Sequence, residues 1–329
     1  MKKKVLLIRL DKIGDLICTL CVDQVSFLKD CEVQWVISKG LGFVPDHAEP
    51  PRTYLELSKE NWQESLRDLR IFLRNYRPDV AVSFQAPWWV SYALWAEKVP
   101  VRAGVKSQWH SFLFLNHGLR QRRSLATQHE ADYNLDLLLH AFSIEEEVTQ
   151  EKTPVLKLQA PANFALLEKH HLQPGHYLVV HPGMAGSALN WPTARYIEFI
   201  EKAAETTQVV LTGTPADEPW LTKIKEYFKN HSRVLSLQNQ LQPAELFTVL
   251  KHAKAVIVPS TGVAHIAASL GVPVLGIYSP VRVQHPRRWA ARGEKVHIFM
   301  PTHQDPDHVD PRCMDEILPD DLLKALSSL

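Results

Sequence analysis

The sequence predicts an α/β protein built from two doubly wound parallel-sheet domains. Short apolar runs of strand length alternate with amphipathic helical stretches along the chain, which is the pattern of parallel sheets covered by crossover helices. The alternation is interrupted once, in the proline-containing segment 151–174, and then restarts. A length of 329 residues also suits two domains. We therefore place the domains at residues 1–155 and 156–329.

Apolar periodicity locates the elements of the first half. An unbroken apolar run, such as residues 4–10, predicts a strand that is buried on both faces of a sheet. A helical stretch opens at Gly14 and Asp15, with apolar residues three and four positions apart down to Leu28, and Pro78 ends a second helix. The expected strands are 4–10, 32–38, 79–85 and 101–105, and the second helix covers 61–76.

The second half repeats this alternation of strands and helices. In open parallel sheets, ligands bind beyond the carboxyl ends of the strands, so the residues that directly follow each strand are the functional candidates. The expected strands are 177–181, 208–212, 234–237, 255–259 and 273–278, and the expected helices are 193–206, 218–230, 243–252 and one that starts near Gly262.

Composition argues against several classes of protein. The formal net charge of +1 is not that of a globally basic nucleic-acid-binding protein. Four cysteines are too few for a disulfide framework and suit a reducing compartment. No apolar run approaches the ~20 residues of a membrane span, and Arg9, Asp11 and Lys12 interrupt the short start that resembles a signal peptide. We expect a soluble, cytoplasmic protein.

The loop after the first predicted strand carries the first candidate residue, Asp15. Gly14 allows a tight turn from strand to helix, and Asp15 falls in the first turn of the helix. A carboxylate there can act as a general base toward a bound hydroxyl. The alternative role is helix capping, which spacing alone favours.

Two loops of the second half suit phosphate binding. The loop 181–187 presents glycine and serine groups before a helix, and 259–265 runs from a strand into the start of another helix, where free amides suit a diphosphate. The alternatives are a long surface turn for the first loop and a buried core histidine for His265. After a third strand, Asp217 can bind a ribose hydroxyl or merely begin a helix.

Two metal-like patterns are weaker. Cys18 and Cys21 have redox-motif spacing, but Cys21 lies on the apolar face of the predicted helix. His303 and His308 lie in a proline-broken loop with irregular ligand spacing. We expect no metal at either place.

Residues 98–129 contain no Asp or Glu but carry six lysines and arginines, with tryptophans in or near the segment. Such a surface suits an anionic acceptor or anionic lipid headgroups, and the alternative is an ordinary solvated face. The expected acceptor contacts are Lys12, Arg120, Arg122 and Arg123.

Five segments in this order resemble glycosyltransferase family 9, the lipopolysaccharide heptosyltransferases. The most specific is 260–273, where Ser-Thr-Gly-x-x-His is joined to Ala-Ala-x-Leu-Gly-x-Pro. The segment 8–15 is similar to the first strand and Gly-Asp turn of the family, and 181–192 to a nucleotide-binding signature. The segments 129–138 and 312–317 are similar to the helix that ends the first domain and to the tail.

The resemblance implies a GT-B architecture, with two Rossmann-like domains facing each other across a cleft and a terminal helix that crosses back to the first domain. It implies a metal-independent, inverting transferase that moves heptose from ADP-heptose to an anionic glycolipid of the lipopolysaccharide inner core, with contact to the inner membrane. Asp15 matches the general base. The matching donor positions are Gly186 and Ser187 (phosphate), Asp217 (ribose), Leu241 (adenine), and Thr261, Gly262 and His265 (diphosphate).

Two places depart from the family pattern. Leu189 and Asn190 stand where inner-core heptosyltransferases often place a lysine that meets the donor phosphate, and Ser260 stands where some members have aspartate. Two alternatives therefore stay open: the same chemistry with another nucleotide sugar for a surface glycan, and a non-catalytic member that binds sugar nucleotide. The cation that replaces the lysine is expected from Lys12, Arg9 or Arg282.

Overall fold

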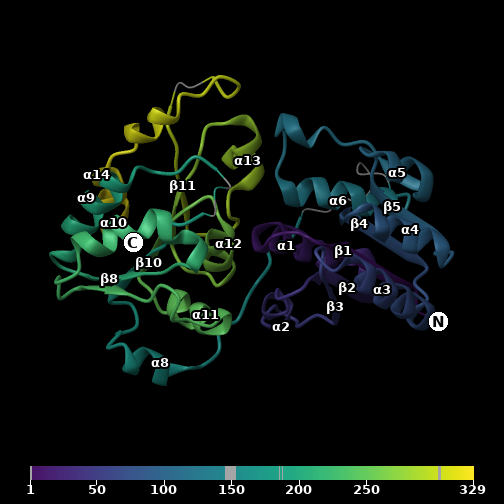
Figure 1. Cartoon of the computed structure of the whole chain (residues 1–329), viewed down its shortest axis with the longest axis horizontal. Coiled ribbons are helices and arrows are strands. Elements are labelled where there is room, and N and C mark those ends of the chain that lie inside the picture. The colour runs from purple at the N-terminus through teal and green to yellow at the C-terminus, as the bar shows by residue number, and fades with distance from the viewer. Residues whose placement is uncertain (1, 145–152, 185, 187, 303–304) are drawn as a thin grey trace. The chain divides into compact units, whose positions relative to one another are not determined.

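The computed structural model describes residues 2–144, 153–184, 186, 188–302 and 305–329. The chain forms two compact units, Met1–Arg123 with Gln128–Leu156, and Ser124–Thr127 with Lys157–Leu329 (Figure 1). Each unit holds one six-stranded sheet in which all pairs of neighbouring strands are parallel. This confirms the predicted α/β class with two doubly wound sheets.

The sheet of the first unit has Rossmann order. Its strands are β1 (Lys4–Arg9), β2 (Glu32–Ser38), β3 (Tyr54–Leu57), β4 (Val80–Gln85), β5 (Val101–Val105) and β6 (His117–Leu119). They are arranged β3-β2-β1-β4-β5-β6. The winding reverses between β1 and β4, and such a switch point is where open α/β sheets bind ligands.

Helices cover both faces of this sheet (Figure 1). They are α1 (Ile13–Leu20), α2 (Phe43–Asp46), α3 (Trp62–Tyr76), α4 (Trp88–Ala96), α5 (Trp109–Phe114) and α6 (Glu130–Ala141). On one face, α3 and α4 share a buried apolar cluster with Leu6 and Ile8 of β1. α6 packs against α1 and contacts β4 and β5. The first predicted helix is shorter than expected: after Leu20 the chain continues in 3-10 turns, which the extended backbone of Val25 separates.

The sheet of the second unit repeats the same order. Its strands are β7 (Tyr177–Val180), β8 (Gln208–Leu211), β9 (Val234–Ser236), β10 (Ala255–Pro259), β11 (Val274–Ile277) and β12 (Val296–Phe299), arranged β12-β11-β10-β7-β8-β9. Its switch point lies between β7 and β10. The helices are α8 (Phe164–Lys169), α9 (Thr193–Ala204), α10 (Glu218–Tyr227), α11 (Pro243–Lys251), α12 (Gly262–Ser269), α13 (Pro286–Trp289) and α14 (Pro319–Ser327).

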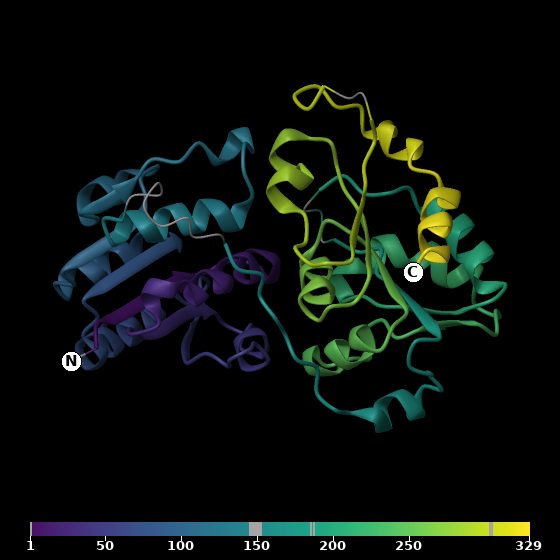
Figure 2. The ribbon, with the colours of Figure 1, turned by 180° about the vertical axis from the view of Figure 1, so that it is seen from behind.

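The terminal helix packs within the second unit, contrary to the expectation that it crosses back to the first domain. α14 lies beside α9 in both views (Figures 1 and 2) and contacts it. Leu322 and Leu326 join the buried cluster that contains Phe199 of α9, and Lys202 Nζ lies 2.8 Å from Asp320 Oδ1. The buried apolar residues of α14 therefore pack against α9, within the second unit. Across the described residues, no helix is long and apolar enough to cross a membrane.

Candidate active site

The carboxyl end of β1 carries a cluster of ionic side chains around Arg9. Arg9 is the last residue of β1 and is only 3% exposed. Its guanidinium lies 2.5 Å from an Asp15 carboxylate oxygen, 3.3 Å from Glu130 and 3.2 Å from Asp11. Glu130 begins α6 and is 1% exposed, and Arg123 also binds it at 2.5 Å. The ion pair with buried Arg9 thus fixes the position of the Asp15 carboxylate.

The contacts of Asp15 bear on both of its predicted roles, general base and helix cap. The N-terminus of α1 receives no side-chain cap at Lys12, and the Asp15 carboxylate accepts a hydrogen bond from Arg9 instead. Asp15 is 21% exposed, so a ligand can reach it. Burial raises the pKa of its carboxyl, and Asp11 and Glu130 raise it further, although Arg9 opposes them. A reachable carboxylate with a raised pKa is chemically suited to accept a proton.

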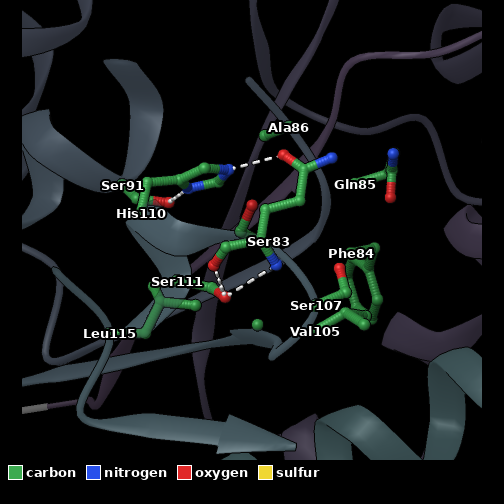
Figure 3. A pocket seen from close by; sticks show the side chains of 12 residues that line it. Ser83, Phe84, Gln85, Ala86, Ser91, Val105, Ser107, His110, Ser111 and Leu115 are labelled. Atoms are coloured by element: carbon green, nitrogen blue, oxygen red, sulfur yellow. Dashed lines mark hydrogen bonds between the residues drawn. The ribbon is translucent and has the colours of Figure 1, made fainter. Parts of the chain in front are cut away.

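A polar pocket lies beside this cluster, at the carboxyl ends of β4 and β5 (Figure 3). Leu10 N donates a 3.2 Å hydrogen bond to Gln85 O, which links the β1–α1 loop to the pocket rim. No acidic residue, lysine or arginine is among the residues that line the pocket. Hydroxyl and amide side chains dominate the lining, contributed by Ser83, Gln85, Ser91, Ser107, Gln108 and Ser111.

His110 is the titratable side chain in the pocket lining. Its Nε2 lies 2.8 Å from Gln108 Oε1 and its Nδ1 lies 3.3 Å from Ser91 Oγ (Figure 3). Burial lowers the pKa of its imidazole, which keeps the ring neutral near pH 7. An uncharged, hydroxyl-rich pocket is suited to the hydroxyls of a sugar rather than to a phosphate group. The sequence did not reveal this pocket, because its residues are ordinary polar residues from three separate stretches of the chain.

Asp217 follows β8, and its carboxylate forms a structural cap that lies against the loop after β7. Asp217 is buried, and its carboxylate accepts hydrogen bonds from the amide (2.9 Å) and hydroxyl (2.8 Å) of Thr214. His181 is also buried and bonds Thr212 Oγ1 at 3.0 Å, and burial lowers the pKa of its imidazole. Gly183 packs against the carboxylate so closely that a Cβ would overlap it. The Asp217 carboxylate thus caps Thr214, and its ribose contact stays a prediction.

Gly183→Ala is expected to destabilise the protein by about 1–3 kcal/mol, because the added methyl must displace the Asp217 cap. The measurement is urea unfolding of the variant and the wild type. The double variant Gly183→Ala with Asp217→Gly is the control, because removing the whole Asp217 side chain, its Cβ included, makes room for the methyl. Purely additive effects of the two changes would contradict the packing argument.

The other predicted donor residues lie at two further loops of the second unit. Thr261 has an extended backbone and its side chain makes no cap to α12, so Gly262 begins a helix whose first amides have no side-chain cap. His265 is buried within α12. Gly186 has a φ of +71°, which favours glycine. Ser187 lies outside the described residues.

Three further residues of the second unit were singled out: Leu241, Asn190 at the place of the family lysine, and Arg282. Leu241 is half-buried between β9 and α11. Asn190 donates a 2.6 Å hydrogen bond to Pro182 O and accepts one from the Tyr196 hydroxyl at 3.0 Å, so its amide is held within the unit and supplies no positive charge. Arg282 forms an exposed ion pair with Asp307.

Three of the four predicted acceptor cations are exposed, and the fourth is not. Lys12, Arg120 and Arg122 are exposed. Arg123 is instead committed to Glu130, and its guanidinium lies 5.6 Å from the Tyr133 ring centroid. Arg123 therefore has a structural ion pair, and its acceptor contact stays a prediction. The sequence could not show this, because the buried partner is a helix-terminal glutamate that looks like an ordinary acidic helix start.

The described residues of the two metal-like patterns make ordinary protein contacts. Cys18 and Cys21 are buried thiols, with Cys21 Sγ 3.5 Å from Cys18 O. His303 lies outside the described residues, and His308 pairs with Asp305 at 3.0 Å. Of the residues described, no three His, Cys, Asp or Glu side chains gather as metal ligands.

Two Rossmann-order sheets in one chain, each with polar loops at its switch point, define a protein of the GT-B class. The family model of glycosyltransferase family 9 (heptosyltransferase) matches residues 66–316. The chain belongs to this family, and it is a glycosyltransferase.

Known proteins agree with this assignment. A family 9 glycosyl transferase from Veillonella parvula matches with a TM-score of 0.80 at 16% identity, covering 99% of this chain and 96% of that one. The E. coli ADP-heptose lipopolysaccharide heptosyltransferase II matches with a TM-score of 0.78 at 16% identity, covering 100% and 98%. Lipopolysaccharide heptosyltransferase 1 of Pseudomonas aeruginosa is 22% identical over 306 residues, 84% of this chain and 79% of the relative. The predicted GT-B fold is thus confirmed.

Proposed function

We propose that this glycosyltransferase moves heptose from ADP-heptose to a lipopolysaccharide inner-core acceptor, with inversion at the anomeric carbon and Asp15 as general base. The observation that carries the proposal is the Asp15 carboxylate, held at 2.5 Å by buried Arg9 at the switch point of the first sheet. The names of the E. coli and Pseudomonas aeruginosa relatives support ADP-heptose as donor and lipopolysaccharide as the setting.

The chemistry divides between the two units. Asp15 takes the proton of the acceptor hydroxyl as its oxygen attacks the anomeric carbon, and the bond to the diphosphate oxygen breaks. Negative charge grows on the departing ADP. The uncapped first amides of α12 at Gly262 and the backbone at Gly186 are suited to meet that charge, with Thr261 and Ser187 adding hydroxyls. No metal or other cofactor takes part in the proposed step.

The acceptor binds on the first unit in this proposal. The neutral pocket beneath Gln85 takes sugar hydroxyls, and the exposed cations Lys12, Arg120 and Arg122 meet the anionic groups of the glycolipid. Such an acceptor resides in a membrane, which places the enzyme at the cytoplasmic face of the inner membrane.

The same reaction with another nucleotide sugar is the second candidate. It is favoured by Asn190, which stands in place of the family lysine and is tied to Pro182 and Tyr196. A non-catalytic binding protein is the third candidate, and the accessible Asp15 with its raised pKa argues against it.

Calorimetric titration of the purified protein with ADP, UDP and GDP in the presence of EDTA tests the proposal. Selective binding of ADP is the expected result, and turnover of ADP-heptose on inner-core acceptor then tests transfer. Preference for UDP or GDP would transfer the assignment to another donor. Binding of ADP without turnover on any acceptor would favour the non-catalytic alternative.

The pH dependence of transfer follows from the raised pKa of Asp15. A general base must be ionised, so kcat/KM is expected to fall on the acidic side with a midpoint above 3.8, the ordinary aspartate value. The measurement is kcat/KM against pH over the range in which the fold persists, with circular dichroism as the check. A midpoint at or below 3.8 would contradict the role of Asp15.

A further inference from the structure

Helices α4 and α5 of the first unit expose a large aromatic surface. Trp88 and Trp95 on α4, and Trp109, Phe112 and Leu113 on α5, are each 40–65% exposed. The two helices pack against each other, so these side chains belong to one surface, which we call the α4–α5 surface.

Ring contacts make this surface continuous. Tyr92 lies between Trp88 and Trp95, with centroid distances of 6.4 and 6.1 Å. Phe114 contacts both Trp95, at 5.6 Å, and Trp109, at 6.4 Å. An isolated exposed aromatic residue needs no explanation, but a contiguous aromatic patch on a folded domain marks a binding surface.

The core of the unit does not account for these side chains. The inner face of α4 already buries Trp89, Val90, Ala93 and Leu94 in the apolar cluster under the sheet. A helix that covers a sheet ordinarily carries polar residues on its outer face. α4 instead carries tryptophans on both faces, so the outer set serves contact with something outside the unit.

Charge at the edge of the surface is positive. Residues 98–129 contain no Asp or Glu. Lys106 Nζ lies 5.1 Å from the Phe112 ring centroid, and Lys98 follows directly after α4 and is exposed. Glu97 is the carboxylate at the end of α4, and two arginines of α3 bind it at 2.6 and 2.9 Å. The surface therefore presents aromatic rings flanked by lysines. The nearby Glu97 carboxylate is neutralised by the two arginines of α3.

We infer that the α4–α5 surface docks the protein on an anionic lipid bilayer. Tryptophan and tyrosine rings favour the headgroup region, where the ring enters the apolar boundary and the polar edge stays hydrated. Exposed leucine and phenylalanine insert beside them, and lysines are attracted to anionic headgroups. The surface is formed by the first unit alone and does not depend on which donor or acceptor the enzyme uses.

Charge favours a bilayer over a second copy of the chain as the occupant. Two copies that meet through the same surface would bring Lys98 and Lys106 of one copy toward those of the other. The repulsion between these lysines would disfavour such an interface. An anionic bilayer instead pairs every one of these cations with opposite charge.

Sedimentation of the full chain with vesicles tests this inference. The protein is expected to bind phosphatidylcholine vesicles that contain about one-third phosphatidylglycerol, to bind pure phosphatidylcholine weakly, and to dissociate as salt rises. Trp109→Ser with Leu113→Ser removes two highly exposed apolar side chains and is expected to lower the partition coefficient at least about tenfold. Lys98→Glu with Lys106→Glu is expected to lower it at least about tenfold as well.

A matched control comes from the second unit, where Phe164 and Ile298 are similarly exposed. Phe164→Ser with Ile298→Ser is expected to leave vesicle binding unchanged. Failure of the wild type to bind anionic vesicles, or binding by both α4–α5 variants that equals that of the wild type, would overturn the inference. So would loss of wild-type self-association, rather than of vesicle binding, in the Trp109 and Leu113 variant, since the surface would then join two copies. The lysine variant keeps the test decisive if the first variant folds poorly.

Discussion

Asp15→Asn abolishes sugar transfer and spares nucleotide binding in the proposed mechanism. The amide keeps the size of the carboxylate but cannot accept the acceptor proton, so kcat is expected to fall by about 10²–10⁴-fold. The donor loops lie in the other unit, and the affinity for ADP is therefore expected to stay close to that of the wild type. The measurements are initial rates with saturating donor and calorimetric titration of ADP.

Asp11→Asn is the matched control for this substitution. Asp11 also faces Arg9, at 3.2 Å, and is comparably exposed, but it precedes α1 and pairs with Lys59 at 3.1 Å. The chemical change is identical and the loss of charge next to Arg9 is the same. A loss of kcat in Asp11→Asn as large as in Asp15→Asn would show that the cluster needs its total charge, and that Asp15 is not the base.

The second large effect is expected on stability. Arg9→Met removes the cation that lies 3.3 Å from the buried Glu130 carboxylate and 2.5 Å from Asp15. Breaking a buried ion pair from one side leaves an uncompensated charge, which costs about 3–5 kcal/mol in the free energy of unfolding. Arg123 still binds Glu130 at 2.5 Å, which sets the effect toward the lower end of that range. Urea unfolding of the variant and the wild type measures the difference.

Arg52→Met separates this stability effect from catalysis. Arg52 and Asp23 form another largely buried ion pair in the same unit, at 2.9 Å, without contact to Asp15. Both variants are expected to lose stability. Only Arg9→Met is expected to lose transfer at temperatures where both remain folded, because Arg9 positions the base. Equal kcat in the two variants would contradict a positioning role for Arg9, and an unchanged free energy of unfolding in Arg9→Met would contradict the burial argument.

Sequence periodicity located most of the strands, the edge strand β9 among them, and missed three others. The three missed strands, β3, β6 and β12, each form an edge of a sheet and are three or four residues long. An edge strand has one neighbour, so fewer of its side chains need to be apolar. α4 was missed for the opposite reason: it is apolar on both faces and therefore lacks a helical period.

Local sequence patterns predicted the features that depend on chain neighbours: two βα alternations, the turn that places Asp15 after β1, the glycine loops after β7 and β10, and the family. The packing of distant segments settled which polar groups pair. Arg9 and Glu130 are 121 residues apart in the chain and meet because α6 packs beside α1. Asp217 differs, because its carboxylate pairs with Thr214, only three residues earlier in the chain, and only the close approach of Gly183 comes from another loop. Local patterns set the backbone, whereas burial and pairing of charges arise only when distant segments pack together.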